Sequence, residues 1–85
     1  MKTTFVEIFE WIIRDDEAIT TKQHYYINTN HIISISWYGE SNSQIYLSNN
    51  YSFLTKGSPE SVWREIDEEI DRQIKYLYQT KDDEL

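Results

Sequence analysis

Apolar residues follow a helical spacing in the last third of this 85-residue chain. They recur every three or four positions, which places them on one face of an α-helix: Val62, Trp63, Ile66, Ile70, Ile74 and Leu77. Ser58 is a good N-cap, and Pro59 suits the first helical position because the N–H that it lacks has no partner there. Three pairs with the acid four residues before the base add support: Glu60–Arg64, Glu68–Arg72 and Asp71–Lys75. The pattern predicts a helix over residues 58–79, followed by an acidic tail over 80–85.

The middle of the chain alternates with a period of two, which is typical of β-strands. Ile33, Ile35 and Trp37 alternate with serines. Residues 39–43 read as a turn, and strands over 44–48 and 51–55 then flank Asn49-Asn50, which we interpret as a two-residue hairpin loop. Upstream, residues 19–28 are rich in Thr, Tyr and Ile and predict another strand that ends near Thr29-Asn30.

The first element is ambiguous. Phe5, Ile8 and Ile12 fit helical spacing, and Thr4 with Glu7 resembles a capping box. The run over residues 5–13 is nevertheless dominated by β-branched and aromatic residues, so we prefer a strand that leads into a loop at 15–17. The predicted fold is a single α+β domain: an antiparallel meander of four to five strands over 3–57, with one long helix packed on one face.

The hairpin register decides which side chains share the second face of that sheet. A two-residue loop places Tyr46 opposite Phe53 and Ile45 opposite Leu54, and opposite residues share a face. Ile33, Ile35, Trp37, Ile45, Leu47 and Leu54 then form the aliphatic face that meets the helix. The other face carries the predicted tyrosine-rich set, our candidates for an interface or a ligand-binding surface: His24, Tyr26, Ile32, Tyr38, Tyr46, Tyr51 and Phe53. A slip of one residue would exchange the two faces.

Charge is segregated along the chain. The net charge is −7, yet the only charged residue from Gln23 to Thr55 is Glu40. Residues 58–85 hold nine acidic residues against four basic ones. Five of these acids form the predicted acidic surface of the helix: Glu65, Asp67, Glu68, Glu69 and Asp71. This balance argues against direct binding to nucleic acid, which needs clustered Lys and Arg.

Motifs of catalysis are missing from the sequence. There is no cysteine, and His24 and His31 stand seven residues apart without the spacing of metal ligands. Lys56-Gly57-Ser58 precedes a helix N-terminus, but Glu60 already supplies negative charge there, so we read it as a cap. We expect no enzyme, cofactor or metal site. No apolar run approaches the roughly 20 residues of a membrane span, and we expect a cytoplasmic protein without a membrane partner.

Residues 26–66 resemble the small FlbD-like proteins of flagellar and swarming motility. The similarity rests on Ile27-Asn28, on the hydrophobic positions Ile32, Ile35, Ile45 and Leu47, and on Ser58-Pro59-Glu60 followed by Val62 and Ile66. The sequence departs from the family pattern at Asn50, where a glycine is usual, in a longer N-terminal hairpin and in the acidic tail. The resemblance implies a small non-enzymatic module of sheet plus helix, and such modules also resemble proteins of phages and mobile elements.

Three functional hypotheses follow. The first is a small acidic interaction protein that forms a homodimer or higher homo-oligomer through the tyrosine-rich set, with a further protein partner unknown. The second is a phage-type inhibitor of a host defence system, whose acidic helix competes for a basic groove. The third is a protein that sequesters a nucleotide-like ligand by stacking it on tyrosines.

Overall fold

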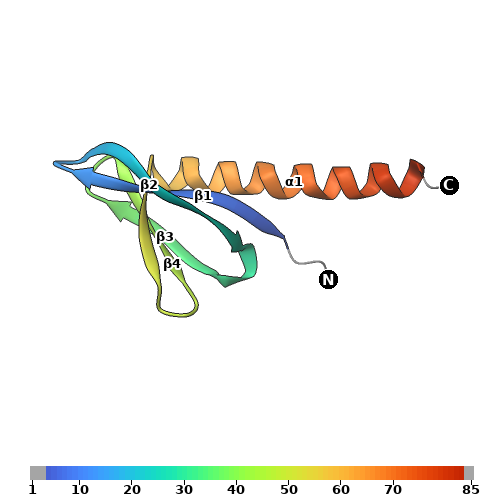
Figure 1. Cartoon of the computed structure of the whole chain (residues 1–85), viewed down its shortest axis with the longest axis horizontal. Coiled ribbons are helices and arrows are strands. Elements are labelled where there is room, and N and C mark those ends of the chain that lie inside the picture. Colours follow the sequence, from blue (N-terminus) through green and yellow to red (C-terminus); the bar gives the residue numbers. More distant parts are fainter. Residues whose placement is uncertain (1–3, 84–85) are drawn as a thin grey trace.

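The chain folds into five antiparallel strands and one C-terminal helix (Figure 1). The computed structural model describes residues 4–83, and the side chains of residues 4–76. The strands are β1 (Phe5–Arg14), β2 (Glu17–Asn28), β3 (Ile32–Tyr38), β4 (Asn42–Leu47) and β5 (Ser52–Lys56). A 3-10 turn, η1 (Thr29–His31), joins β2 to β3, and the helix is α1 (Pro59–Asp83). The α+β class is confirmed, as is the strand at the N-terminus.

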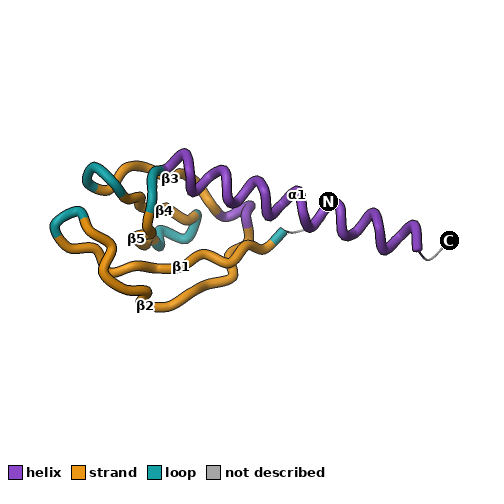
Figure 2. The backbone as a smooth tube through the Cα atoms, turned by 90° about the horizontal axis from the view of Figure 1, so that it is seen from above, coloured by secondary structure: helices purple, strands orange, loops and turns teal. Residues whose placement is uncertain are grey.

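The expectation of one continuous meander is wrong. The strands form two sheets, a β1–β2 ribbon and a β3–β4–β5 sheet. Figure 2 shows them in the order β3, β4, β5, β1 and β2, so that β1 lies next to β5. The hydroxyl of Thr55 in β5 donates to the carbonyl oxygen of Phe9 in β1 over 2.8 Å. A side-chain hydrogen bond therefore joins β5 to β1, whereas backbone hydrogen bonds would join these strands in a single sheet.

The β4–β5 hairpin has a different register from the predicted one. Ile45 pairs with Phe53, and Tyr46 pairs with Ser52. The loop is one residue longer than predicted, because the N–H of Leu47 donates to the carbonyl oxygen of Tyr51 and leaves three residues between them. The last of the three, Asn50, has a φ of 68°. Three-residue hairpin loops typically place their last residue in this left-handed region, which asparagine tolerates. The shift moves Phe53 to the inner face.

A bulge at Ile33 changes the faces of β3 as well. Ile32 pairs with Leu47 and Ser34 with Tyr46, which leaves Ile33 without an opposite residue. A bulge of this kind reverses the in–out alternation on one side of it. Ile32 consequently packs against the core, whereas Ile33, predicted for the core face, is 64% exposed. Trp37, also predicted for that face, is exposed, while Ile35 packs as predicted.

One hydrophobic core lies between the ribbon, the sheet and the first half of the helix. Its buried members are Val6, Ile8, Ile27, Ile45, Phe53, Val62 and Ile66. Burying side chains of this size contributes roughly 1.5–3 kcal/mol each. The core thus receives residues from four strands and the helix, and the inner face of the sheet is covered by both the ribbon and α1.

The helix matches its predicted start and extends beyond its predicted end. Ser58 caps it through its hydroxyl, which accepts from the N–H of Ser61 over 3.2 Å. Val62 and Ile66 are buried and Ile70 packs on the core, but Ile74 is exposed because the distal turns project past the strands (Figure 1). The molecule is therefore elongated, 54 × 23 × 21 Å. The side chain of Leu77 and residues 84–85 of the predicted tail lie outside the described parts.

The predicted ion pairs of the helix form only in part. Arg64 reaches Glu60 at 3.5 Å, as expected for residues four apart. Arg72, in contrast, pairs with Glu69, three residues before it, instead of with Glu68. No ion pair joins Asp71 to Lys75 among the described side chains. Glu68 therefore makes no direct ion pair among the described side chains, although its charge is one of the causes that raise the pKa of Arg72.

Candidate interaction groove

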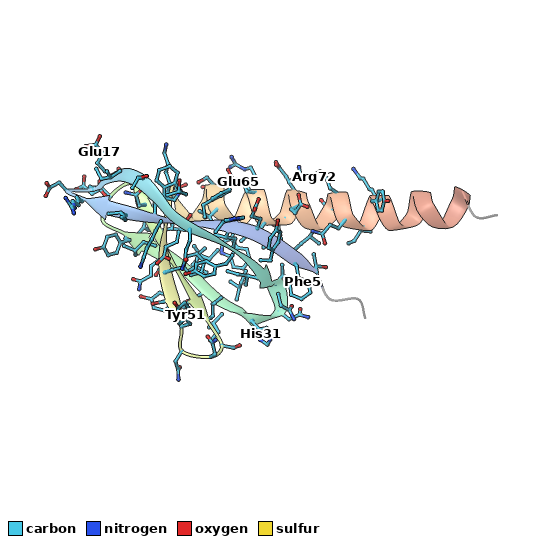
Figure 3. All side chains as sticks on the ribbon, viewed as in Figure 1. Phe5, Glu17, His31, Tyr51, Glu65 and Arg72 are labelled. Atoms are coloured by element: carbon cyan, nitrogen blue, oxygen red, sulfur yellow. The ribbon has the colours of Figure 1, made fainter. Side chains whose placement is uncertain are left out.

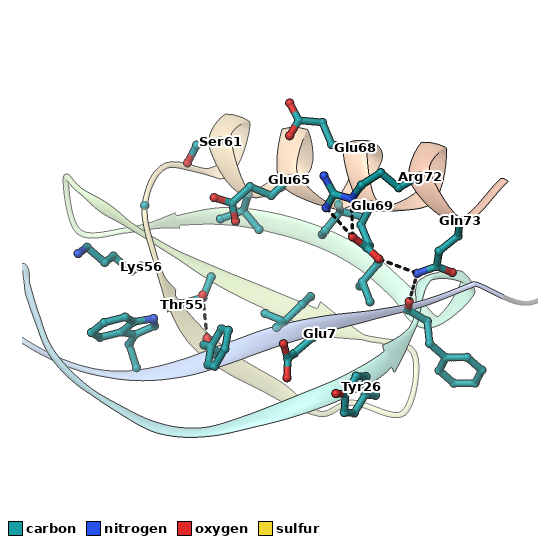
Figure 4. Close-up of a pocket in the computed structure, with 18 residues that line it drawn as sticks. Glu7, Tyr26, Thr55, Lys56, Ser61, Glu65, Glu68, Glu69, Arg72 and Gln73 are labelled. Carbon is teal, nitrogen blue, oxygen red and sulfur yellow. Dashed lines mark hydrogen bonds and ion pairs between the residues drawn. The ribbon is translucent and has the colours of Figure 1, made fainter. Parts of the chain in front are cut away.

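A groove of about 770 Å³ lies between β1 and α1 (Figure 4). We call it the β1–α1 groove. One wall is the first half of β1, from Phe5 to Phe9, and the other is the helix from Ser61 to Gln73. Trp11, Tyr26, Thr55 and Lys56 line it as well. The ammonium of Lys56 lies over the Trp11 ring, 5.2 Å from its centroid, which fixes a cationic end for the groove.

The groove exposes the outer edge of β1, because β1 is paired on only one side. Residues 6 and 8 face β2 with their backbone groups, and so does Thr4, whose carbonyl oxygen accepts from the N–H of Thr29. In a strand, backbone groups alternate between the two edges, so those of Phe5, Glu7 and Phe9 point into the groove. The carbonyl oxygen of Phe5 accepts from the Gln73 side-chain amide over 2.7 Å.

Glu7 lies between Phe5 and Phe9, whose carbonyl oxygens accept hydrogen bonds from the side chains of Gln73 and Thr55. Its own N–H and carbonyl oxygen have no backbone partner among the described residues. An unpaired strand edge is a template for pairing with another chain. The groove thus presents free main-chain groups as well as side chains.

Acidic residues dominate the charge of the groove. Its lining contains four acidic residues, Glu7, Glu65, Glu68 and Glu69, and two basic ones, Lys56 and Arg72. Hydrogen bonds from Arg72 lower the pKa of Glu69, and the same carboxylate raises the pKa of Arg72. Glu7 contacts the ring of His24 through Nδ1. This leaves Glu65 and Glu68 without an ion-pair partner within the described side chains.

Exposed aromatic side chains continue from the groove onto the outer face of the ribbon. Phe9 stacks on His24 with ring centroids 5.6 Å apart, and His24 meets Tyr26 edge-on at 6.1 Å. Tyr26 is 70% exposed, and Phe5 and Phe9 are about half exposed. Aromatic residues are enriched at protein interfaces. The groove therefore combines an acidic wall with an aromatic rim.

The predicted tyrosine-rich set does not form one face. His24 and Tyr26 lie on the outer face of the ribbon, whereas Tyr38 and Tyr46 lie on the outer face of the β3–β4–β5 sheet. Ile32 is half-buried and Phe53 is buried in the core, so neither is available on that surface.

Tyr51 occupies a third place. It lines a smaller cavity of about 380 Å³ near His31, with Tyr25 and Leu47. Figure 3 shows Tyr51 and His31 on the side of the molecule away from Glu65 and Arg72. The register shift moves Tyr51 and Phe53, and the bulge moves Ile32, because each exchanges the faces of neighbouring residues. The division into two sheets separates His24 and Tyr26 from Tyr38 and Tyr46.

The predicted acidic surface divides in two. Glu65, Glu68 and Glu69 line the groove, whereas Asp67 and Asp71 are exposed and do not line it. Sequence reasoning missed Phe5, Phe9, Trp11, Lys56 and Gln73 as neighbours of these acids. The sequence of β1 does contain a sign of a second contact surface, because large apolar residues occur on both faces of this strand. A strand that packs only one face against a core needs large apolar residues on that face alone.

Two further features bear on chemistry. No group of three or more His, Asp or Glu residues that could hold a metal ion occurs in residues 4–76. No helix in the described range is long and apolar enough to cross a bilayer.

Comparisons with protein-family models, with curated proteins and with solved structures gave no match. The FlbD-like resemblance stays a prediction.

Proposed function

We propose that this chain is a small non-enzymatic interaction protein and that the β1–α1 groove binds its partner. The observation that carries the proposal is the coincidence, in one concave surface, of an open strand edge, exposed aromatic rings and carboxylates without ion-pair partners. Its negative potential favours a cationic partner and disfavours the phosphates of a nucleotide-like ligand.

The test compares two pairs of substitutions that remove the same charge from the same helix. Glu65→Gln with Glu68→Gln alters the groove, whereas Asp67→Asn with Asp71→Asn alters the helix outside it. The probe is a blocked synthetic peptide that alternates lysine and valine, with a glutamate–valine peptide as its control. We expect the groove pair to weaken binding of the basic peptide roughly tenfold, the effect of about 1.4 kcal/mol.

The control pair is expected to change binding less than about twofold, because exposed charges outside the contact are screened by solvent and salt. Calorimetric titration at low and high salt measures both effects. If the two pairs weaken binding equally, the net charge of the helix governs the interaction and the groove is not the site. Failure of the basic peptide to bind at low salt would also reject the proposal.

We propose separately that two copies associate through the outer face of the β3–β4–β5 sheet. The supporting observation is that the exposed residues of β3 and β4 on this face, Ser34, Ser36, Tyr38 and Tyr46, are all uncharged. By register, Lys56 at the end of β5 is the charged residue that shares the face. Copies of a chain with a net charge of −7 repel one another, so a face without acidic residues is the one on which their repulsion is weakest. A species that is strictly monomeric in sedimentation would reject this proposal.

A further inference from the structure

The free edge of β1 has the features of a strand-accepting site. Phe5, Glu7 and Phe9 direct their backbone groups into the β1–α1 groove. Over this stretch the strand extends roughly 13 Å, at about 3.3 Å per residue, which is enough to pair a short extended segment. A partner strand at this edge would meet the aromatic rim on one side and the acidic helix on the other.

Two side chains already donate hydrogen bonds to this edge of β1, as the backbone of a neighbouring strand would. The Gln73 amide donates to the Phe5 carbonyl oxygen, and the Thr55 hydroxyl donates to the Phe9 carbonyl oxygen. Each bond is of the kind that the N–H of a neighbouring strand would make. Between them, the N–H and carbonyl oxygen of Glu7 lack a backbone partner among the described residues. The side chains of Gln73 and Thr55 thus occupy the carbonyl oxygens at the two ends of the edge, and the backbone of Glu7 at its centre stays open.

Charge decides which kind of strand fits. A second copy that paired β1 with β1 around a two-fold axis would bring Glu7 close to Glu7 and one acidic helix close to the other, and like charges opposite each other destabilise a strand pair. A segment with Lys or Arg at alternate positions would instead place its cations against Glu65 and Glu68. The groove is therefore complementary to a basic partner and not to its own copy.

From these observations we infer that the β1–α1 groove captures an extended basic segment of a partner protein by strand addition to β1. The main-chain bonds form with Glu7 and its neighbours, and the basic side chains of the segment contact the acidic helix. The amide of Gln73 moves off the Phe5 carbonyl oxygen when the segment enters. This inference rests on the proposed function, because it uses the same groove.

The experiment separates main-chain pairing from simple charge attraction. The intact chain is titrated with the blocked lysine–valine peptide and with the same peptide N-methylated at alternate residues, in two variants that cover both edges of the peptide. N-methylation keeps the charge and removes the donors of one peptide edge. We expect only the variant methylated on the edge that pairs with β1 to bind roughly tenfold more weakly, whereas the variant methylated on the opposite edge binds like the unmethylated peptide. Hydrogen exchange of the Glu7 amide should slow with the two peptides whose pairing edge is intact and not with the third.

A pair of substitutions at Glu7 tests the protein side of the bond. Glu7→Pro removes the N–H that points into the groove, and proline is tolerated in a strand where its N–H would face away from the ladder. Glu7→Ala is the matched control, since it removes the same carboxylate and keeps the N–H. We expect Glu7→Pro to bind the peptide several-fold more weakly than Glu7→Ala, with both variants unfolding in one cooperative transition.

The outcomes distinguish the two proposals. Salt-sensitive binding that depends on Glu65 and Glu68 but is indifferent to N-methylation would overturn strand addition and leave the groove as the binding surface. Faster exchange, or no change, at the Glu7 amide in the saturated complex would overturn it as well. If Glu7→Pro fails to fold, the methylated peptides on the unaltered chain still decide the question.

Discussion

Asp16 joins the tips of two hairpins that are distant in the sequence. Its carboxylate accepts from the N–H of Glu40, the N–H of Ser41 and the Ser41 hydroxyl, at 2.9–3.1 Å. Its carbonyl oxygen accepts from the side-chain amide of Asn42, which is buried. Gly39 lies at a φ of +68°, and a Cβ at that position would collide with the Asp16 carboxylate. The β1–β2 turn is thus fixed against the β3–β4 turn by one acid and one glycine.

This bonding makes stability depend on pH. The hydrogen bond from the Ser41 hydroxyl, followed by those from the backbone of Glu40 and Ser41, holds the pKa of Asp16 below its usual value of 3.8. Because the folded pKa lies below the unfolded one, the ionised carboxylate stabilises the fold above the unfolded pKa. That contribution is lost as the pH falls through the folded pKa.

The matching variant is Asp16→Asn, which keeps the side-chain shape and tolerates the positive φ of 63° but has no carboxylate to ionise. We expect it to be less stable than the unaltered chain at neutral pH. We also expect the difference in free energy of unfolding to shrink once the pH falls below the Asp16 pKa. Urea unfolding of both proteins across this range measures the difference, and a gap that stays constant with pH would contradict the assignment.

At the scale of elements, the β4–β5 hairpin decides which aromatic residues are available for binding. A loop of two residues would expose Phe53 with Tyr46, whereas the observed loop buries Phe53 to 3% and leaves Tyr46 40% exposed. Asn49 stabilises this longer loop, since its side-chain oxygen accepts from the N–H of Tyr51 over 3.0 Å. One additional loop residue therefore changes the role of every side chain in β5.

The register is tested by two truncations in the same hairpin. Phe53→Ala is expected to reduce the free energy of unfolding by about 3–5 kcal/mol, because it leaves a cavity in the core. Tyr46→Ala is expected to reduce it by about 1 kcal/mol or less, as is usual for a surface position. Denaturant unfolding measures both changes. Similar costs for the two substitutions would favour the two-residue loop.

Much of this organisation could be predicted from local sequence, and the faces could not. The helix start at Ser58-Pro59, the strand at the N-terminus and the presence of the other strands follow from capping, periodicity and β-propensity. Their limits differ from the expected ones: β4 begins at Asn42, inside the segment expected as a turn. Loop length and bulges depend on how strands pair, and one residue more or less exchanges inside and outside. The bulge at Ile33 and the left-handed Asn50 have no unique signature in the sequence around them.

At the scale of the whole molecule, acidic and uncharged surfaces lie on different sides. The acidic wall belongs to α1 and the β1–α1 groove, while the outer face of the β3–β4–β5 sheet exposes Ser34, Ser36, Tyr38 and Tyr46. The two proposed interactions therefore use separate surfaces and respond to different forces. One is driven by charge attraction, and the other is opposed by the repulsion between whole molecules.

Salt should affect the two interactions in opposite directions. Raising the ionic strength from about 0.01 M to 1 M shortens the Debye length from roughly 30 Å to 3 Å. We expect self-association, followed by sedimentation velocity at micromolar concentration, to strengthen with salt because the net charge of −7 is screened. Tyr46→Glu should abolish it, whereas Glu68→Gln should not. Association that weakens with salt would contradict the proposal that two copies meet through the outer face of the β3–β4–β5 sheet.

Local sequence patterns account for the helix, for the presence of the strands and for the segregation of charge along this chain. Periodicity, capping residues and composition are local properties, and they act before distant segments meet. The surfaces that these elements form depend on how the strands and the helix pack together. The β1–α1 groove exists because β1 packs beside β5 without a ladder and α1 crosses over the same core, so that Glu7 and Tyr26 from the ribbon line the same groove as Glu65 and Glu68 from the helix. Such a juxtaposition depends on the packing of side chains from four strands and a helix, which no local pattern encodes.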